Sequence, residues 1–225
     1  MTHIFWYGEH IFEYLIQMIP CVCLAVAAFF LVNPLREKRL KALHQVSEAT
    51  REHMLLFFVA FCAGLLSLTM FPSGFWPHII NYIATPSDWR NGPELALFYP
   101  SWEEIIAETD YRNLYKPFQE IYRGLTAGPW VFFLLLGNII MFIPIGFFPA
   151  LLWRNPSWKK ALIYGLVTSG AIEFVQFFIG RSTDIDDILL NTFGALIGYW
   201  LFCLIRLFLP EQCTKFCCYT REERT

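Results

Sequence analysis

The sequence predicts an all-α, polytopic membrane protein with about five membrane-spanning helices and a long outer loop that contains a short interfacial helix. Of the 225 residues, 56% are hydrophobic and 18% are aromatic, which is more apolar than an ordinary soluble domain. The apolar residues form runs of about twenty, the length an α-helix needs to cross a bilayer. The formal net charge of -2 argues against nucleic acid as a partner, because nucleic-acid-binding domains are strongly basic.

The five expected spans are apolar runs separated by polar or turn-forming residues. They cover residues 11–32, 54–71, 130–152, 161–180 and 187–209. Pro20 predicts a kink in the first span because it lacks a backbone donor, and Asn33-Pro34 is expected to end that span. No Lys or Arg precedes it, so the chain lacks the basic start of a cleavable signal peptide and the first helix should be retained.

The order of spans and loops predicts four parts. Residues 1–72 hold two spans and a basic connection, 73–129 form an aromatic and acidic loop, 130–209 form a three-helix core, and 210–225 form a polar tail. Trp and Tyr favour the headgroup layer, so the loop is expected to lie along the membrane surface. Within it, Ser101 and Glu104 have the spacing of a capping box ahead of an interfacial helix, and Asn91-Gly92 predicts a tight turn.

The distribution of Lys and Arg predicts the orientation in the plasma membrane. With the N-terminus outside and the C-terminus in the cytoplasm, 12 of these residues lie on the inner side and 5 on the outer side, as the positive-inside rule requires. The basic connection after the first span is interpreted as a topology signal, and binding of anionic headgroups is the alternative.

The seven cysteines indicate no disulfide framework, because they lie in predicted helices or in the inner tail. Three interpretations of the tail cysteines stay open. Cys217 and Cys218 are acylated, they bind a metal together with Cys213, or they lie beside the membrane without a function.

Polar residues in and between the last two spans are the strongest functional signal. A charged group inside a membrane helix costs roughly 2.5–3.5 kcal/mol, so such residues are rarely placed there without use. From the helical rise, Glu173 and Asn138 each lie roughly 10 Å below the outer ends of their helices, and Gln176 lies roughly 6 Å below. The residues expected to meet in one outer-leaflet cluster are Asn138, Glu173, Gln176, Arg181, Asp184, Asp187 and Asn191.

The spacing of residues along the fifth span refines this expectation. Asp184, Asp187 and Asn191 recur at i, i+3 and i+7 and therefore share a face, whereas Asp186 points elsewhere. Asp184 is also positioned to cap the helix, and Arg181 is the nearest counter-charge in the sequence. Gly194 and Gly198 have the small-xxx-small spacing that lets another helix approach closely.

These motifs resemble the VanZ-like family of bacterial membrane proteins. The resemblance covers about residues 113–198 and leaves out the first two spans. It is carried by Asn113-Leu114 with Pro117-Phe118, Asn138-Ile-Ile-Met-Phe142-Ile-Pro144-Ile-Gly146, Glu173-Phe-Val-Gln176-Phe, Thr183-Asp184-Ile-Asp186-Asp187, and Asn191-Thr192-Phe-Gly194 with Gly198. It implies a cell-envelope protein linked to resistance to the glycopeptide teicoplanin, and it supplies no established reaction.

Several functions stay open at this point. In the first, a non-enzymatic outer-leaflet pocket binds membrane lipids, a lipid-anchored glycopeptide or a cell-wall precursor, with the aromatic loop as a lid. In the second, an intramembrane enzyme acts on an envelope lipid. Its catalytic candidates are Glu173, as general base, and Asp187, and Asp184 and Asp187 would hold Mg²⁺ or Ca²⁺. In the third, Glu173 carries a proton in a small transporter. The structural alternative is that the polar residues only lock three helices together.

Overall fold

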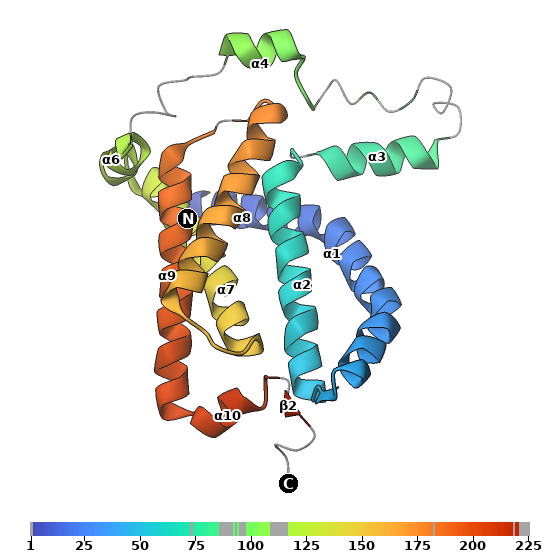
Figure 1. The fold of residues 1–225 in the computed structure, drawn as a ribbon. Helices are drawn as coiled ribbons and strands as arrows, with labels where there is room; N and C mark the ends of the chain where they lie inside the picture. The colour runs from blue at the N-terminus through green and yellow to red at the C-terminus, as the bar shows by residue number, and fades with distance from the viewer. Residues whose placement is uncertain are drawn as a thin grey trace.

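The computed structural model describes residues 2–72, 74–85, 92, 94, 98–108, 117–181, 183–217 and 219–220. Five helices in this part of the chain are long and apolar enough to cross a membrane, which confirms the predicted fold class. They are α1 (Thr2–Ala42), α2 (Ala49–Met70), α7 (Pro129–Leu152), α8 (Trp158–Phe178) and α9 (Ile185–Phe208). Figure 1 shows α7, α8 and α9 gathered on one side, with α2 beside them and α1 on the periphery.

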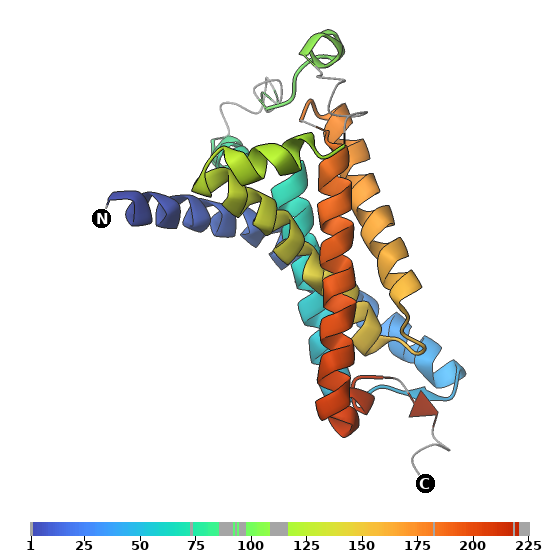
Figure 2. The same ribbon diagram turned by 90° about the vertical axis from the view of Figure 1, so that its left-hand side faces the viewer.

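The expected end of the first span at Asn33-Pro34 is wrong, because α1 continues through Pro20 and Pro34 to Ala42. A proline removes one backbone hydrogen bond, and side-chain contacts around Pro34 support the helix. The Asn33 amide donates to Glu37 Oε1 at 3.0 Å, and Arg36 donates to Asn33 Oδ1 at 2.7 Å. Figure 2 shows that α1 bends, so that its N-terminal part points away from the bundle.

Polar side chains join α1 to α2 at both ends of the pair. At one end, Ser67 Oγ donates to the Gln17 carbonyl at 2.7 Å, and the Gln17 amide donates to the Phe71 carbonyl. At the other end, Arg36 pairs with Glu52. These contacts hold α1 and α2 together as a helical hairpin. In the connection between the two helices, β1 (Gln45–Val46) pairs antiparallel with β2 (Tyr219–Thr220) of the C-terminal tail.

The long loop between α2 and α7, predicted to lie outside, contains three short helices among its described residues, more than the one predicted. They are α3 (Phe75–Ala84), α4 (Trp102–Glu108) and α6 (Gln119–Thr126). The predicted capping box at the start of α4 is confirmed. Glu104 Oε2 accepts from the Ser101 amide at 2.8 Å and from Ser101 Oγ at 2.9 Å, and the Ser101 bonds hold the pKa of Glu104 below its ordinary 4.5. The predicted turn residue Asn91 and the motif residues Asn113 and Leu114 lie outside the described part.

Close packing of α9 on α7 depends on glycine, as the small-xxx-small spacing predicts. A Cβ atom on Gly194 would lie 2.2 Å from the Ile139 carbonyl oxygen, and one on Gly198 would lie 2.0 Å from that of Ile143. In the opposite direction, a Cβ atom on Gly146 of α7 would lie 1.8 Å from the Ala195 carbonyl oxygen. The two backbones therefore touch along three successive points, which fixes the rotation of α9 and the direction of its polar residues.

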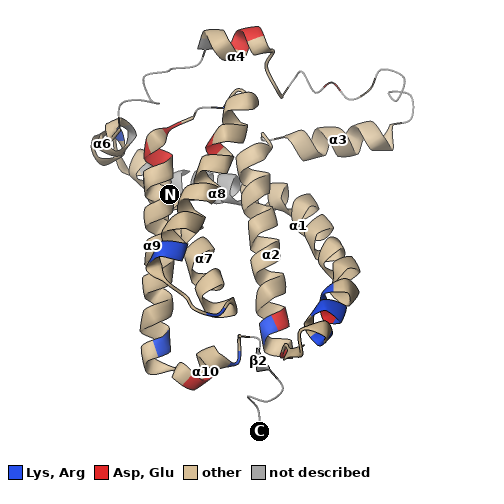
Figure 3. Ribbon diagram, viewed as in Figure 1, with Lys and Arg blue, Asp and Glu red and all other residues tan. Residues whose placement is uncertain are grey.

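The final residues form a short cap beneath the bundle. Helix α10 (Pro210–Thr214) follows α9 directly and turns across its end (Figure 1). Figure 3 shows basic residues gathered at this end of the molecule, whereas the opposite ends of α8 and α9 carry acidic residues.

Candidate functional site

Glu173 of α8 contacts the start of α9. Its side chain is 3% exposed, and its Oε2 atom accepts a hydrogen bond from the Asp184 amide at 3.0 Å. Thr183 Oγ1 donates to the Glu173 carbonyl at 3.5 Å. The structure thus places Glu173 and Asp184 together, and the contact holds the turn between the two spans.

Asp184 performs the capping role that its position predicts. Its Oδ1 atom accepts from the Asp186 amide at 2.9 Å, at the N-terminus of α9. Burial is the largest influence on the Asp184 carboxyl and raises its pKa above the ordinary 3.8. The Asp186 carboxylate raises the pKa further, whereas the hydrogen bond from the Asp186 amide and the positive charge of Arg123 of α6 lower it. Both the helix end and Arg123 therefore favour the ionised form, against a larger cost of burial.

Two further pairs connect α9 to its neighbours below this level. The Asn138 amide of α7 donates to Asp187 Oδ1 at 2.6 Å, and the Asn191 amide donates to Ser169 Oγ of α8 at 2.9 Å. Asn191 Oδ1 is buried and has no hydrogen-bond partner among the described residues. Ser169, which is 0% exposed, was missed from the sequence because a lone serine in a helix carries little signal.

Gln176 and Arg181 reach a different helix from the other site residues. The Gln176 amide donates to the Thr69 carbonyl at 3.3 Å, and Arg181 Nη1 donates to the carbonyls of Leu68 and Thr69 at 3.1 and 2.9 Å. These acceptors belong to the last turn of α2, whose final carbonyls have no partner within the helix. Among the described residues Arg181 makes no ion pair with a carboxylate, and it ties the end of α8 to α2 instead.

Asp186 has a role that the sequence analysis did not find. It is 0% exposed, and its two oxygens accept from the Phe118 amide at 2.5 Å and the Ile121 amide at 3.2 Å. These amides lie at the N-terminus of α6, where Phe118 offers no side-chain cap. Asp186 therefore supplies the cap from α9, in the position where Asp is favoured. Asp186 lies one residue before Asp187 and therefore off the face that Asp184, Asp187 and Asn191 share. That position was a signal that Asp186 faces another element.

Helix α4 closes over the end of α8. Pro100 packs on Gly180, where an added Cβ atom would lie 2.2 Å from Pro100 Cγ. The ring of Trp102 meets that of Phe178 edge to face, with centroids 5.5 Å apart, and Ile105 is buried. The aromatic loop thus covers the C-terminal end of α8 at these contacts.

The candidate metal ligands Asp184 and Asp187 already have protein partners in the Asp186 amide and the Asn138 amide. In the described part of the chain, no group of three or more His, Cys, Asp or Glu side chains is arranged to hold a metal ion. Cys217 Sγ donates to the Leu151 carbonyl at 3.4 Å, and Cys218 lies outside the described residues.

The fold and these contacts define a polytopic membrane protein whose polar residues connect four spanning helices, α2, α7, α8 and α9, at one end. The chain belongs to the VanZ/LLP1 family, whose profile matches residues 58–206. That match includes the seven predicted site residues and extends into α2, which the motifs alone had left out.

A curated relative agrees with this assignment. Protein VanZ of Enterococcus faecium is 30% identical over 95 residues, which cover 40% of this chain and 59% of VanZ. The chain therefore aligns with less than two thirds of that relative. No solved structure matches the chain.

Proposed function

We propose that this protein acts in the outer leaflet of the bacterial plasma membrane, where it contributes to glycopeptide resistance of the teicoplanin type or to the handling of envelope lipids. Membership of the VanZ/LLP1 family supports this proposal. The observation that carries it is Glu173, a carboxyl group that is 3% exposed within a candidate span. Because such placement is costly, an ionisable residue inside a membrane helix points to a functional site.

The contacts of the surrounding residues support a polar ligand. Glu173 and Asp187 sit where three helices meet, and the buried Asn191 Oδ1 has an unused capacity to accept a hydrogen bond among the described residues. An unpaired buried acceptor costs about 1–3 kcal/mol, which a donor from a lipid headgroup or a glycopeptide would recover. In this proposal α4 is the lid, since it already packs against the end of α8.

The orientation belongs to the same proposal. We place the N-terminus outside and the C-terminus in the cytoplasm, which puts the polar residues and α4 in the outer leaflet. The basic end of the molecule seen in Figure 3 would then face the cytoplasm, as the positive-inside rule favours. Neither catalysis nor proton transport is favoured by a specific contact among the described residues.

Susceptibility to teicoplanin and vancomycin tests the proposal in a host that expresses wild type, Glu173→Gln or Asp187→Asn at matched membrane levels. Glutamine at 173 keeps an oxygen that can accept the hydrogen bond from the Asp184 backbone amide, and asparagine at 187 keeps one for the Asn138 side-chain amide. These changes therefore remove charge with little change of shape. Glu13→Gln is the matched control, because Glu13 lies in α1 with an exposed side chain.

We expect wild type and Glu13→Gln to protect the host from teicoplanin, and both cluster variants to lose that protection. Equal protection by all four chains would overturn the role of the cluster. No protection by any of them would remove the glycopeptide function and leave envelope-lipid handling, which lipid analysis of the purified protein then tests.

A further inference from the structure

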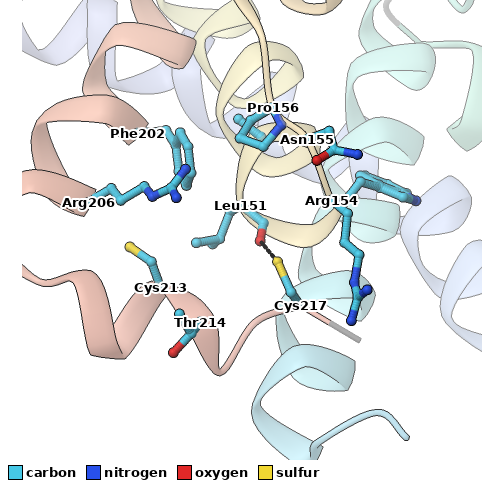
Figure 4. Close-up of a pocket in the computed structure, with 11 residues that line it drawn as sticks. Leu151, Arg154, Asn155, Pro156, Phe202, Arg206, Cys213, Thr214 and Cys217 are labelled. Carbon is cyan, nitrogen blue, oxygen red and sulfur yellow. Dashed lines mark hydrogen bonds between the residues drawn. The ribbon is translucent and has the colours of Figure 1, made fainter. Parts of the chain in front are cut away.

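A cavity of about 350 Å³ lies at the end of the bundle opposite the polar cluster. It is lined by the last turn of α7, the connection that follows it, the last two turns of α9, and α10 with Cys217. Figure 4 shows Arg206 beside Phe202 on one side of the cavity and Arg154 beside Cys217 on the other. Residues from three separate segments thus form one site, which the family motifs do not reach.

The lining combines positive charge with an apolar wall. Among the described residues, two arginines and no acidic side chain line the cavity, and its apolar surface includes Leu151, Trp153 and Phe202. Arg206 makes no ion pair with a carboxylate among the described residues. A guanidinium group is the side chain best suited to bind phosphate, because its planar fork can donate two parallel hydrogen bonds.

The thiols of the cavity add no negative charge. Burial raises the pKa of Cys213 above its ordinary 9.0, although Arg206 lowers it, so the thiol is neutral at physiological pH. Cys217 Sγ is directed to the Leu151 carbonyl. These two cysteines therefore form a neutral part of the wall rather than a counter-charge for the arginines.

The position of the cavity along the spanning helices favours a membrane lipid over a soluble anion as its ligand. Leu152 and Phe208 end the candidate spans of α7 and α9, so the cavity lies where headgroups meet the hydrocarbon core. Leu207 and Phe208 beside it are exposed, as lipid-facing side chains are. A ligand there could place a phosphate between the arginines while its acyl chains follow the apolar surface into the bilayer.

We propose that this cavity binds the phosphate group of an anionic phospholipid, with Arg206 and Arg154 as its cationic contacts and Leu151 and Phe202 as the wall for the first acyl carbons. Basic pockets between spanning helices are a recognised form of lipid site. The bound lipid would join α7, α9 and α10 at the end of the bundle. This site is separate from the polar cluster of the proposed function.

Native mass spectrometry of the full chain in detergent tests this proposal. The protein is titrated with dioleoyl phosphatidylglycerol, dioleoyl phosphatidylcholine and inorganic phosphate. We expect phosphatidylglycerol to bind more tightly than phosphatidylcholine. Arg206→Gln should weaken phosphatidylglycerol binding about fivefold, the effect of one basic residue near a membrane surface, whereas Arg39→Gln, the same change at an exposed residue of α1, should leave it unchanged.

A variant that keeps both arginines gives an independent measurement. Thr214 is exposed at the edge of the cavity, so Thr214→Trp should fill its mouth and reduce phosphatidylglycerol binding without disturbing the bundle. Three outcomes would overturn the proposal: equal binding of the two lipids, equal losses in Arg206→Gln and Arg39→Gln, or full displacement of the lipid by inorganic phosphate. The last result would assign the cavity to a soluble anion.

Discussion

The Glu173 carboxylate accepts a hydrogen bond from the Asp184 amide at 3.0 Å, so a buried side chain of α8 holds the residue that caps α9. Asp184 in turn accepts from Asp186, and Asp186 caps α6. The three acidic residues therefore link two spanning helices, α8 and α9, and the loop helix α6 in a single chain of contacts. Changes along this chain of contacts are therefore expected to affect α6 as well as the contact between α8 and α9.

Replacing Gly198 with alanine should destabilise the contact between α7 and α9. The added Cβ atom would lie 2.0 Å from the Ile143 carbonyl oxygen, so the helices must separate, and overpacking of this kind costs about 1–3 kcal/mol. Unfolding in mixed detergent micelles with increasing dodecyl sulfate measures the loss. Gly170→Ala is the matched control, because a Cβ atom there meets nothing within 4 Å. Equal midpoints for the two variants would contradict the observed packing.

Removing the Asp186 carboxylate should release α6 from α9. In Asp186→Ala the Phe118 and Ile121 amides lose their acceptor, and loss of an N-cap costs about 0.5–2 kcal/mol. Hydrogen exchange of residues 118–126 should accelerate, while exchange within α7 should not. Glu103→Ala serves as the control, since it removes an exposed acidic residue of α4. Unchanged exchange at Ile121 in Asp186→Ala would show that the cap does not hold α6.

A double-mutant cycle on Asn138→Ala and Asp187→Ala should find a favourable coupling between the two side chains. Their hydrogen bond measures 2.6 Å and joins α7 to α9. Measured couplings between polar side chains in membrane helices average about 0.6 kcal/mol and reach about 1.7 kcal/mol. The four proteins are compared by unfolding in mixed detergent micelles. Strictly additive losses would mean that the bond contributes nothing to stability.

The titration of Asp184 should make stability decrease as the pH rises. Burial raises the pKa of this carboxyl above 3.8 in the folded protein, so the folded state binds more protons than the unfolded state between these two values. The contribution of Asp184 to the free energy of unfolding is fully present below pH 3.8. It is lost as the pH rises through the pKa of Asp184 in the folded protein.

Asp184→Asn provides the comparison because it keeps an oxygen for the cap and does not titrate. Relative to this variant, wild type should lose stability as the pH rises above the ordinary aspartate pKa of 3.8, measured by unfolding in one detergent at constant ionic strength. Glu173, Asp186 and Arg123 face the group in both proteins. A constant difference across this range would rule out a raised pKa at Asp184.

The sequence predicted some contacts of the polar residues and missed others. Asn138 and Asp187 meet as expected, because both lie at a similar depth on neighbouring helices. Arg181 was expected near carboxylates, yet it donates to two carbonyls of α2. Its direction depends on the turn after α8 and on the position of α2, neither of which follows from local spacing.

The sequence by itself determined the number of spans, the approximate ends of the last four, and the capping residues Ser101 and Asp184, since apolar run length and local hydrogen bonding set these features. Only the tertiary structure decided that Asp186 caps a helix 65 residues away, that Asn191 meets Ser169, and that α1 continues through Pro34. These features depend on helix rotation, and the rotation of α9 is set by its backbone contacts with α7 at Gly194 and Gly198. Such contacts between distant segments exist only once the helices have packed.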